Sequence, residues 1–348
     1  RDWEASLHAA DRVEGHGSWT VELAGDLEAL RIFTSGSAGE PVRIDKTLAS
    51  LCEEAQVLCR QFAWPDGAVV ATVPPQHLYG LTFSILLPWF LGAAWIDEVP
   101  LYPLDILHAV RSSHGKTLIS VPAQYQAMLQ HGTGLHGVFC VTSAAAMPAR
   151  LAREWQRQSG NDLLEIYGST ETGVIASRRQ LAEPAWSALP QVNLSVARGV
   201  LQVCSPFSGA GPATPVLAGD RVELLSDGRF HLLGRADAIV KVAGRRVSLT
   251  RVESSLLDCH GVLDAAVVAM PAPGQMREVE ICAAVVAHDP SEASVYSLRD
   301  RLRDHLDAVE VPRRIVFVEQ LPRSARGKLS VDAVRRLFAL DERTCVQA

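Results

Sequence analysis

Hydroxyl-bearing residues and glycines gather in one short stretch near the start of the chain. The apolar pair Ile32-Phe33 is followed by Thr34-Ser35-Gly36-Ser37-Ala38-Gly39. Glycine lets the backbone adopt a positive φ and approach a ligand closely. Ser and Thr hydroxyls with free backbone N–H groups then make a concave anion site. The stretch is a candidate phosphate-binding loop; the alternative is a Ser/Gly-rich surface turn. It is not the usual nucleotide P-loop, because Val110 stands where Gly115-Lys116-Thr117 would need an earlier glycine.

A carboxylate stands at the end of a second polar stretch. Tyr167-Gly168-Ser169-Thr170-Glu171 follows an apolar run and precedes Thr172-Gly173. A carboxylate in such a place can hold Mg²⁺, a hard cation that prefers oxygen ligands and the company of phosphates. The alternative is a capping box at the start of a helix, since Ser, Thr and Glu also suit helix starts.

Three further segments combine glycine with charged side chains. They are Gly219-Asp220, the run from Gly234-Arg235-Ala236-Asp237 through Lys241 to Gly244, and the basic stretch that ends in Gly327-Lys328. Taken singly, they read as a turn, a solvated hairpin and a charged surface loop.

The elements that must position these segments alternate in type along the first half of the chain. Apolar runs predicted as strands alternate with helical patterns, which indicates a mostly parallel sheet covered by helices on both faces. In such sheets ligands bind at loops beyond the carboxyl ends of the strands, and we expect the Ser/Gly loop, Pro74–Gly80 and Gly168–Gly173 to lie there. The predicted elements are a helix over 46–62, strands at 68–73 and 93–96, a helix over 103–112, a strand at 117–121, a helix over 123–131, a strand at 138–142, a helix over 148–159 and a strand at 163–167.

The pattern changes after residue 178. Short strands with Gly and Pro turns over 192–235 predict a small antiparallel or barrel-like β unit. From residue 238 a compact α+β segment follows. We therefore predict a large N-terminal domain, 1–236, and a small mobile C-terminal domain, 237–348.

Composition limits the functional classes. The chain has 348 residues, a net charge of −6 and a pI near 6.0, so bulk charge offers no attraction to nucleic acid or to an anionic membrane. The seven cysteines are dispersed without a C-x-x-C pair, which argues against a disulfide framework or zinc site and favours the cytoplasm. The apolar run Leu81–Trp95 contains Pro88 and Gly92 and is too short to span a membrane.

The polar segments, in this order, resemble the motifs of the adenylate-forming superfamily, which includes acyl-CoA synthetases, nonribosomal peptide adenylation domains and firefly luciferase. The resemblance covers about residues 30–340. It rests on Thr-Ser-Gly-Ser-x-Gly-x-Pro, Tyr-Gly-Ser-Thr-Glu, Gly-Asp, Gly-Arg-x-Asp…Val-Lys…Gly-x-Arg and Pro-Arg…Gly-Lys. It implies an ATP-dependent ligase that joins a carboxylic acid to AMP and then transfers the acyl group to a thiol. A serine hydrolase is disfavoured, because no G-x-S-x-G occurs.

The resemblance also implies roles for individual residues. Thr170 would bond the α-phosphate, Glu171 would hold Mg²⁺, Asp220 would accept the ribose hydroxyls, and Lys328 would reach the α-phosphate and the substrate carboxylate. His77 would line or gate the acyl pocket. The positions implied to bind the nucleotide are Thr34, Ser35, Gly36, Ser37, Gly39, Tyr167, Gly168, Asp220 and Arg235; the hinge and thioester-step positions are Asp237, Lys241 and Gly244; the pocket positions are Ser143, Ala144, Ala145 and Gly168.

The chain departs from the family pattern in the phosphate loop. Ala38 stands where a second Thr is usual and Val42 where a Lys is usual, so Arg43 or Lys46 is a possible substitute for that charge. Only 33 residues precede Thr34, which predicts a compact subfamily or a missing N-terminal part. The loop, with Lys46 close behind it, is similar to the short ligases of aryl-polyene and xanthomonadin pathways.

From that likeness we expect an aryl acid such as a hydroxybenzoate as substrate and the phosphopantetheine thiol of an acyl carrier protein as acceptor. Two alternatives stay open. One is an acyl-CoA synthetase that uses free CoA on an aryl or fatty acid. The other is a catalytically weakened homologue that binds acyl groups or a partner, an alternative that the changes at Ala38 and Val42 keep open.

Overall fold

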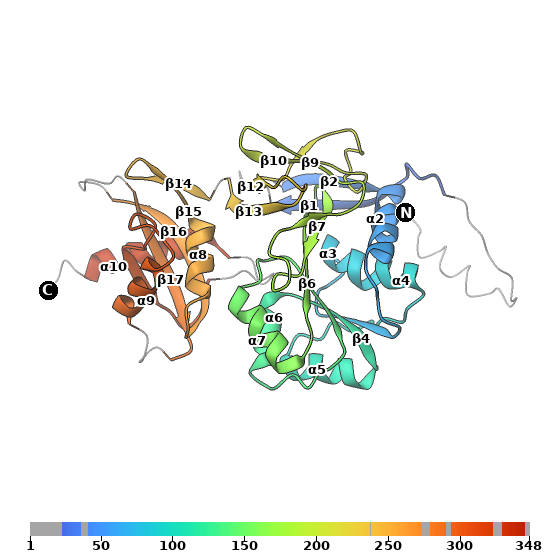
Figure 1. Ribbon diagram of the computed structural model, residues 1–348, viewed down its shortest axis with the longest axis horizontal. Coiled ribbons are helices and arrows are strands. Elements are labelled where there is room, and N and C mark those ends of the chain that lie inside the picture. Colours follow the sequence, from blue (N-terminus) through green and yellow to red (C-terminus); the bar gives the residue numbers. More distant parts are fainter. Residues whose placement is uncertain are drawn as a thin grey trace, which may run out of the picture.

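The computed structural model describes residues 23–35, 41–236, 238–272, 279–289, 294–322 and 329–344. These residues form a large lobe, up to residue 236, and a small lobe, from residue 238, which lie at opposite ends of the long axis of the molecule (Figure 1). Three predicted site residues, Gly36, Ser37 and Gly39, lie outside the described residues, as do Asp237 and Lys328.

A six-stranded sheet forms the centre of the large lobe. Its order is β3-β4-β5-β6-β7-β8, with β3 to β6 parallel and the last two strands antiparallel to their neighbours. The strands are β3 (Ala68–Ala71), β4 (Gly115–Ser120), β5 (Phe139–Thr142), β6 (Leu163–Ser169), β7 (Gly173–Arg178) and β8 (Ser187–Ala188), and the intervening helices are α5 (Pro103–Ser112), α6 (Pro122–Leu129) and α7 (Ala149–Ser159). The predicted α/β class is confirmed.

The sheet is covered on both faces because its strands are apolar on both sides. Val70 and Leu118 pack with α5, α6 and α7, around the buried ring of Trp155. Their neighbours Val69 and Ile119 belong to the second core, on the side of α2 (Leu48–Gln61). Consecutive strand residues therefore serve different cores, as the two-residue repeat of a strand requires.

The segment after β3 differs from its prediction. A helical stretch runs through α3 (Leu78–Gly80), the π-helix η1 (Leu81–Leu86) and α4 (Leu87–Leu91). The predicted strand at 93–96 is wrong: Trp95 makes only an isolated bridge to Val69. An apolar run of this length fits a strand or a buried helix equally well, so periodicity alone could not decide.

The Ser/Gly loop also sits differently from the expectation. It connects β1 (Glu28–Ser35) and β2 (Pro41–Thr47), which pair antiparallel from Glu28↔Thr47 to Ser35↔Pro41. This hairpin is a separate two-stranded sheet. The strands that flank the loop thus form an antiparallel hairpin, where the sequence predicted the carboxyl end of a parallel strand.

Antiparallel strands complete the large lobe, as the short strand pattern predicts. One three-stranded sheet and one hairpin lie above the central sheet (Figure 1). They comprise β9 (Asn193–Ala197), β10 (Val200–Cys204), β11 (Val216–Leu217), β12 (Asp220–Leu224) and β13 (Phe230–Arg235).

The small lobe is built on a three-stranded sheet of order β16-β17-β18. One face packs against α8 and α9, and Phe338 of α10 packs on the other face. The elements are β14 (Ile239–Val242), β15 (Arg245–Ser248), α8 (Leu249–Leu257), β16 (Val262–Pro271), β17 (Val279–Ala287), α9 (Val295–Arg303), β18 (Arg314–Phe317) and α10 (Val331–Thr344). The buried clusters thus fall on either side of residues 236–237, but the predicted domain boundary and mobility stay predictions.

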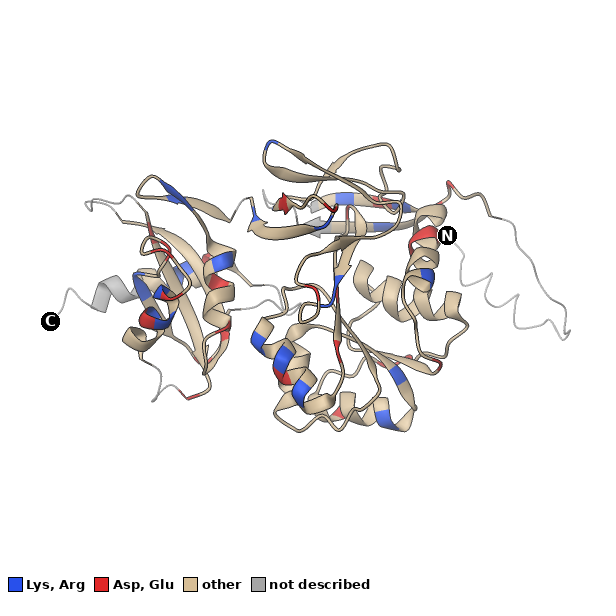
Figure 2. Cartoon of the chain, viewed as in Figure 1, with Lys and Arg blue, Asp and Glu red and all other residues tan. Residues whose placement is uncertain are grey.

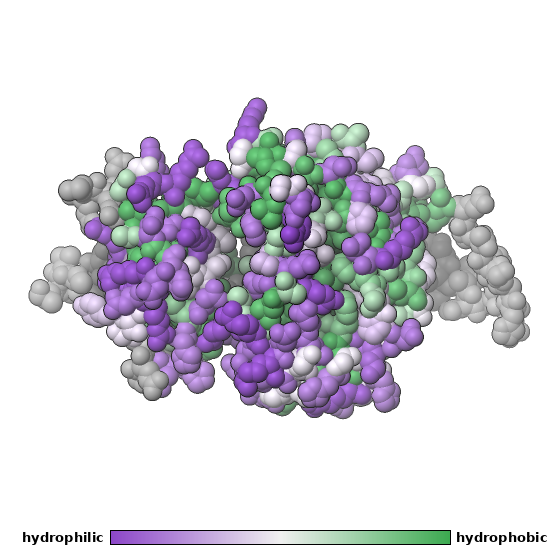
Figure 3. Space-filling model, in the orientation of Figure 1, coloured by the Kyte–Doolittle hydropathy of each residue, from purple (hydrophilic) through white to green (hydrophobic). Residues whose placement is uncertain are grey.

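The described surface carries both signs of charge. Acidic and basic residues are interspersed over the two lobes (Figure 2), in keeping with the modest net charge of −6. On the face seen in Figure 3, hydrophilic side chains predominate on the small lobe. Every helix within the described residues is too short or too polar to cross a membrane.

Candidate active site

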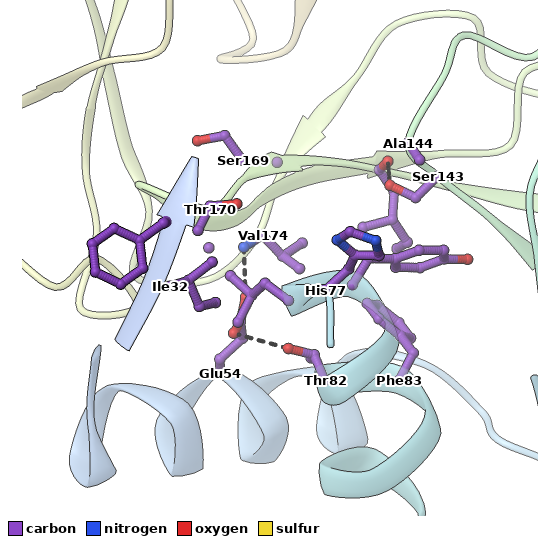
Figure 4. A pocket seen from close by; sticks show the side chains of 16 residues that line it. Ile32, Glu54, His77, Thr82, Phe83, Ser143, Ala144, Ser169, Thr170 and Val174 are labelled. Atoms are coloured by element: carbon purple, nitrogen blue, oxygen red, sulfur yellow. Dashed lines mark hydrogen bonds between the residues drawn. The ribbon is translucent and has the colours of Figure 1, made fainter. Parts of the chain in front are cut away.

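An inner cavity of about 600 Å³ lies between α3–η1 and the turn from β6 to β7. Its residues come from segments far apart in sequence (Figure 4). The lining residues are Ile32, Phe33, Glu54, His77, Leu78, Tyr79, Thr82, Phe83, Ser143, Ala144, Ile166, Gly168, Ser169, Thr170, Gly173 and Val174. The predicted residues His77, Ser143, Ala144, Gly168 and Thr170 are therefore brought together.

One wall of the inner cavity is aromatic and apolar. The rings of Tyr79 and Phe83 lie 5.2 Å apart between centroids, at 58° to each other. The Tyr79 hydroxyl donates to the Ser120 carbonyl at 3.0 Å, so its polar end is bonded within the sheet. Such a wall suits an apolar or aromatic group.

A buried carboxylate forms part of the same cavity. Glu54 of α2 accepts hydrogen bonds from the Val174 backbone N–H at 2.6 Å and from the Thr82 hydroxyl at 3.4 Å (Figure 4). Burial raises the pKa of Glu54, while attraction to Lys46 and these two bonds work against that rise. The sequence offered one signal that we missed, since Glu54 falls on the same helical face as Leu51 and Leu58 and so interrupts the buried stripe.

The turn between β6 and β7 carries Thr170 and Glu171. It is held by the side chains of Ser169 and Thr172, which bond each other at 3.0 Å and each accept a hydrogen bond from the other's backbone N–H. The capping-box alternative for this segment is wrong, because a strand and not a helix follows it. Thr170 lines the inner cavity.

An interlobe cavity of about 570 Å³ adjoins the first one. It brings the predicted Asp220 and Arg235 together with Tyr167 and Ala145. Its lining residues are Thr142, Ser143, Ala144, Ala145, Ala146, Met147, Pro148, Ala149, Glu165, Ile166, Tyr167, Gly168, Arg178, Gln180, Trp186, Asp220, Leu232, Gly234, Arg235, Thr250, Ser254, Leu257 and Asp258.

Tyr167 and Asp220 are joined directly. The Tyr167 hydroxyl donates to Asp220 Oδ2 at 2.6 Å, and the ring packs on Trp186 at 5.6 Å between centroids. Burial, then the charge of Asp220, raises the pKa of Tyr167 well above its usual range. The hydroxyl therefore stays protonated and keeps donating to the carboxylate.

A buried ion pair in this cavity was not predicted. Glu165 and Arg178 face each other across β6 and β7, with Nη2 and Oε2 3.0 Å apart, and Arg178 lies 4.4 Å from the ring centroid of Trp186. Burial raises the pKa of Glu165, against the opposing effect of Arg178. A Glu inside an apolar strand was the available signal.

The two cavities meet at four shared residues. Both are lined by Ser143, Ala144, Ile166 and Gly168. Ser143 is fixed by donating to the Ile166 carbonyl at 2.8 Å, and Ala144 has a φ of 71°. A positive φ is uncommon for a residue other than glycine. A ligand with one end in each cavity would pass this junction.

Other predicted residues lie elsewhere. Lys241 is exposed, and Gly244, with a φ of 82°, belongs to the β14–β15 connection; neither is among the residues that line the two cavities. Thr34 and Ser35 form the end of β1, but their side chains lie outside the description.

The proposed substitutes for the missing loop lysine have different surroundings. Arg43 Nη2 lies 2.6 Å from the Asp45 carboxylate, and its side chain is half exposed. Lys46 is fully buried. Neither is among the residues that line the two cavities, and the replacement of the loop lysine by either stays a prediction.

Two family models match this chain. One, described as "AMP-binding enzyme", matches residues 3–205, and the other, "AMP-binding enzyme C-terminal domain", matches residues 251–328. The first range includes every residue that lines the inner cavity and the second includes the small lobe's sheet, whereas Asp220 and Arg235 of the interlobe cavity lie between the two ranges.

Individual proteins show the same likeness. A 4-coumarate–CoA ligase of Rhodobacter capsulatus is 32% identical over 322 residues, which is 91% of this chain and 79% of the relative. The human mitochondrial acyl-coenzyme A synthetase ACSM2A is 26% identical over 353 residues, 88% of this chain but only 60% of the relative.

Solved structures agree on the fold. ATP-bound MatB from Rhodopseudomonas palustris has a TM-score of 0.81 at 22% identity, over 96% of this chain and 72% of that one. The o-succinylbenzoate CoA synthetase MenE from Bacillus subtilis, in complex with its acyl-adenylate OSB-AMP, has a TM-score of 0.78 at 20% identity, over 90% of this chain and 70% of that one.

Proposed function

This chain belongs to the AMP-binding enzyme family of adenylate-forming enzymes, and from that membership we propose that it makes an acyl-AMP from an aryl acid and passes the acyl group to a phosphopantetheine thiol of an acyl carrier protein. As an AMP-forming ligase it uses ATP to activate a carboxylic acid. The aryl acid and the carrier protein are our own inferences beyond that activity.

The observation that carries the proposal is the junction of two cavities. An acyl-AMP has an acyl end and a nucleotide end joined at one phosphate. The inner cavity, with Tyr79 and Phe83, suits the acyl end, and the interlobe cavity, with Tyr167 and Asp220, suits adenine and ribose. Thr170 and the Ser143–Ala144 backbone then lie where the mixed anhydride would be.

The first half-reaction joins two anions. A carboxylate oxygen of the acid attacks the α-phosphorus, and the bond to the β-phosphate oxygen breaks, releasing pyrophosphate. Charge that develops on the phosphate needs donors and cations. We assign Thr170 to the α-phosphate, Asp220 and Tyr167 to the ribose, and Lys328 to the α-phosphate and acid oxygens. The backbone of the Ser/Gly loop would hold the β- and γ-phosphates.

Magnesium would bind in this arrangement mainly through the phosphates of ATP. Within the described residues no three His, Cys, Asp or Glu side chains gather to hold a metal ion. One carboxylate, that of Glu171 beside the cavity, matches the way Mg²⁺ binds through one or two carboxylates, waters and substrate phosphates. Bound Mg²⁺ would neutralise phosphate charge as pyrophosphate leaves.

The second half-reaction needs a thiol. The thiol loses its proton to solvent, the resulting thiolate attacks the acyl carbon of the mixed anhydride, and the bond from that carbon to the phosphate oxygen breaks, so that AMP leaves. We propose that the small lobe turns about Asp237 between the two steps and exchanges Lys328 for the segment around Lys241 and Gly244, a hinge motion at a few junction residues.

Free CoA is the main alternative as acceptor. The relatives named as CoA ligases and synthetases favour it. A catalytically weakened homologue has less support, since the Tyr167–Asp220 pair and the Thr170 turn are both formed.

Acid-dependent exchange of pyrophosphate into ATP tests the proposal. We expect exchange with aryl acids in a panel that also contains alkyl acids. Addition of CoA, or of a carrier protein with and without its phosphopantetheine, then identifies the acceptor by AMP release. Exchange with none of the acids would overturn the ligase proposal, and thioester formation with CoA alone would overturn the carrier protein.

A further inference from the structure

Two charged side chains of the β2–α2 region are buried inside the large lobe. Lys46, near the end of β2, is 0% exposed, and Glu54, on α2, is 1% exposed. Charged groups are rarely buried this deeply unless they are paired and hydrogen-bonded. Each of the two makes such bonds, and each has one with the segment 171–174: Lys46 with the Glu171 carbonyl and Glu54 with the Val174 N–H.

Lys46 binds backbone carbonyls on two different segments. Its Nζ donates to the Phe207 carbonyl at 2.6 Å and, more weakly, to the Glu171 carbonyl at 3.4 Å. The first carbonyl belongs to the segment after β10, and the second to the turn between β6 and β7. Lys46 therefore ties the turn that carries Thr170 to a neighbouring part of the lobe.

Glu54 holds the other end of the same turn. Its Oε1 accepts the Val174 N–H at 2.6 Å, three residues after Glu171 (Figure 4). Attraction between Glu54 and Lys46 joins the two anchors electrostatically. The Lys46 ammonium thus binds a carbonyl at one end of the segment 171–174, and the Glu54 carboxylate binds an N–H at its other end.

The turn has little freedom between these anchors. Gly173 has a φ of 72°, and a Cβ added there would lie 2.7 Å from Phe207 Cβ and 2.8 Å from Glu54 Oε1. The first neighbour, Phe207, is bonded to Lys46 through its carbonyl, and the second is Glu54 itself. A small displacement of either charged residue would move Thr170 and Glu171, and displacements of about 1 Å can cost on the order of a hundredfold in rate.

We propose that Lys46 and Glu54 are a buried positioning pair, which sets the place of Thr170 and Glu171 relative to bound ATP. The proposal rests on the function proposed above. In this proposal Lys46 does not replace the usual phosphate-loop lysine. Its ammonium holds the turn that binds phosphate and does not bind phosphate itself. Lys46 lines neither cavity, and Glu54 lines the inner cavity while its two oxygens accept from the Val174 N–H and the Thr82 hydroxyl.

Matched variants separate positioning from simple stability. Lys46→Met removes both donor bonds, whereas Glu54→Gln removes the charge but keeps an oxygen for the Val174 N–H. In Lys46→Met alone an unpaired buried carboxylate remains, which destabilises the lobe. The double variant contains neither charge, so the part of the stability lost to the unpaired carboxylate should return, while the turn stays without its Lys46 anchor. Arg60→Met, which removes an exposed cation of α2 six residues after Glu54, is the control.

The measurements are thermal unfolding, pyrophosphate exchange and amide hydrogen exchange of the peptide over 169–175, all on the full chain. For the double variant we expect a melting temperature above that of Lys46→Met, an exchange kcat at least about tenfold below that of the unchanged protein with the KM for the acid within about threefold, and faster amide exchange. Lys46→Arg should recover part of the kcat. Arg60→Met should match the unchanged protein in all three.

Three results would overturn the proposed role of the pair: a kcat that returns together with stability in the double variant, unchanged amide exchange over 169–175, or an equal loss of kcat in Arg60→Met. Failure of the proposed function looks different. The unchanged protein would then exchange no acid at all, and the amide exchange of the variants would still test the pair by itself.

Discussion

Replacing Tyr167 by Phe tests the assignment of the nucleotide end most directly. The change removes only the hydroxyl that donates to Asp220 Oδ2 at 2.6 Å. The ring keeps its neighbours Trp186 and Phe230, at 5.6 and 6.1 Å between centroids. Any effect should therefore come from Asp220 and not from lost packing.

The size of the effect follows from that one bond. A hydrogen bond to a charged group contributes about 1.5–3 kcal/mol, but water can replace the hydroxyl at the partly exposed Asp220, so we expect about 1–2 kcal/mol. If Asp220 orients the ribose, the KM for ATP should rise about 5- to 30-fold, because 1.4 kcal/mol is tenfold. The kcat should change by less than about threefold, since the ribose is bound alike in ground and transition states.

The assay is pyrophosphate exchange with ATP varied at saturating acid. Tyr79→Phe is the matched control, because its hydroxyl donates to the Ser120 carbonyl on the other cavity's wall. It should leave the KM for ATP alone. An unchanged KM for ATP in Tyr167→Phe, or a larger rise in Tyr79→Phe, would refute the assignment of the interlobe cavity to the nucleotide.

Four further predictions concern three other residues, Lys328, Ala144 and Asp45. Lys328→Ala should depress exchange far more than thioester formation from preformed acyl-AMP, and equal losses in both assays would contradict its one-step role. Ala144→Leu should lower kcat/KM for the acid about a hundredfold, because the larger side chain fills the junction of the cavities. Ala144→Gly should raise the unfolding free energy measured by urea titration by about 1 kcal/mol, because glycine relieves the strain of the positive φ. Hydrogen bonds from Arg43 and then Arg31 lower the pKa of Asp45 to about 2. The stabilising effect of the charged Asp45 is therefore present above its ordinary pKa of 3.8 and is lost as the pH falls towards 2. Asp45→Asn should flatten that part of the stability–pH curve, and an identical curve would show that the pairing contributes nothing.

Much of the large lobe could be predicted because its signals are local. Apolar runs alternating with helical repeats placed β4, β5 and β6 and helices α5 and α7 within a few residues. The motif order likewise predicted Thr170, Asp220 and Arg235, which the structure then places on cavity walls. Such polar residues can be recognised from the sequence because they stand at the ends of clearly patterned strands, where few residue types other than ligand-binding ones are expected.

The errors also have a common cause. Leu81–Trp95 reads as an apolar run in either strand or helix, and the Ser/Gly loop reads alike after a parallel strand or inside a hairpin. Pairing partners decide both cases. Such partners are distant in sequence, so no window around the residues contains the answer.

The sequence by itself determined the family, the order of the chemical groups and the α/β architecture, since each depends on residue types and spacing. Only the tertiary structure decided which charges are buried and what they hold. Lys46 was one of two candidates to replace a phosphate-binding lysine, and Glu54 was not singled out at all; in the fold they meet the two ends of the Glu171–Val174 segment. Burial and convergence are properties of packing between β2, α2 and the β6–β7 turn, and packing is set by contacts more than a hundred residues apart in the chain.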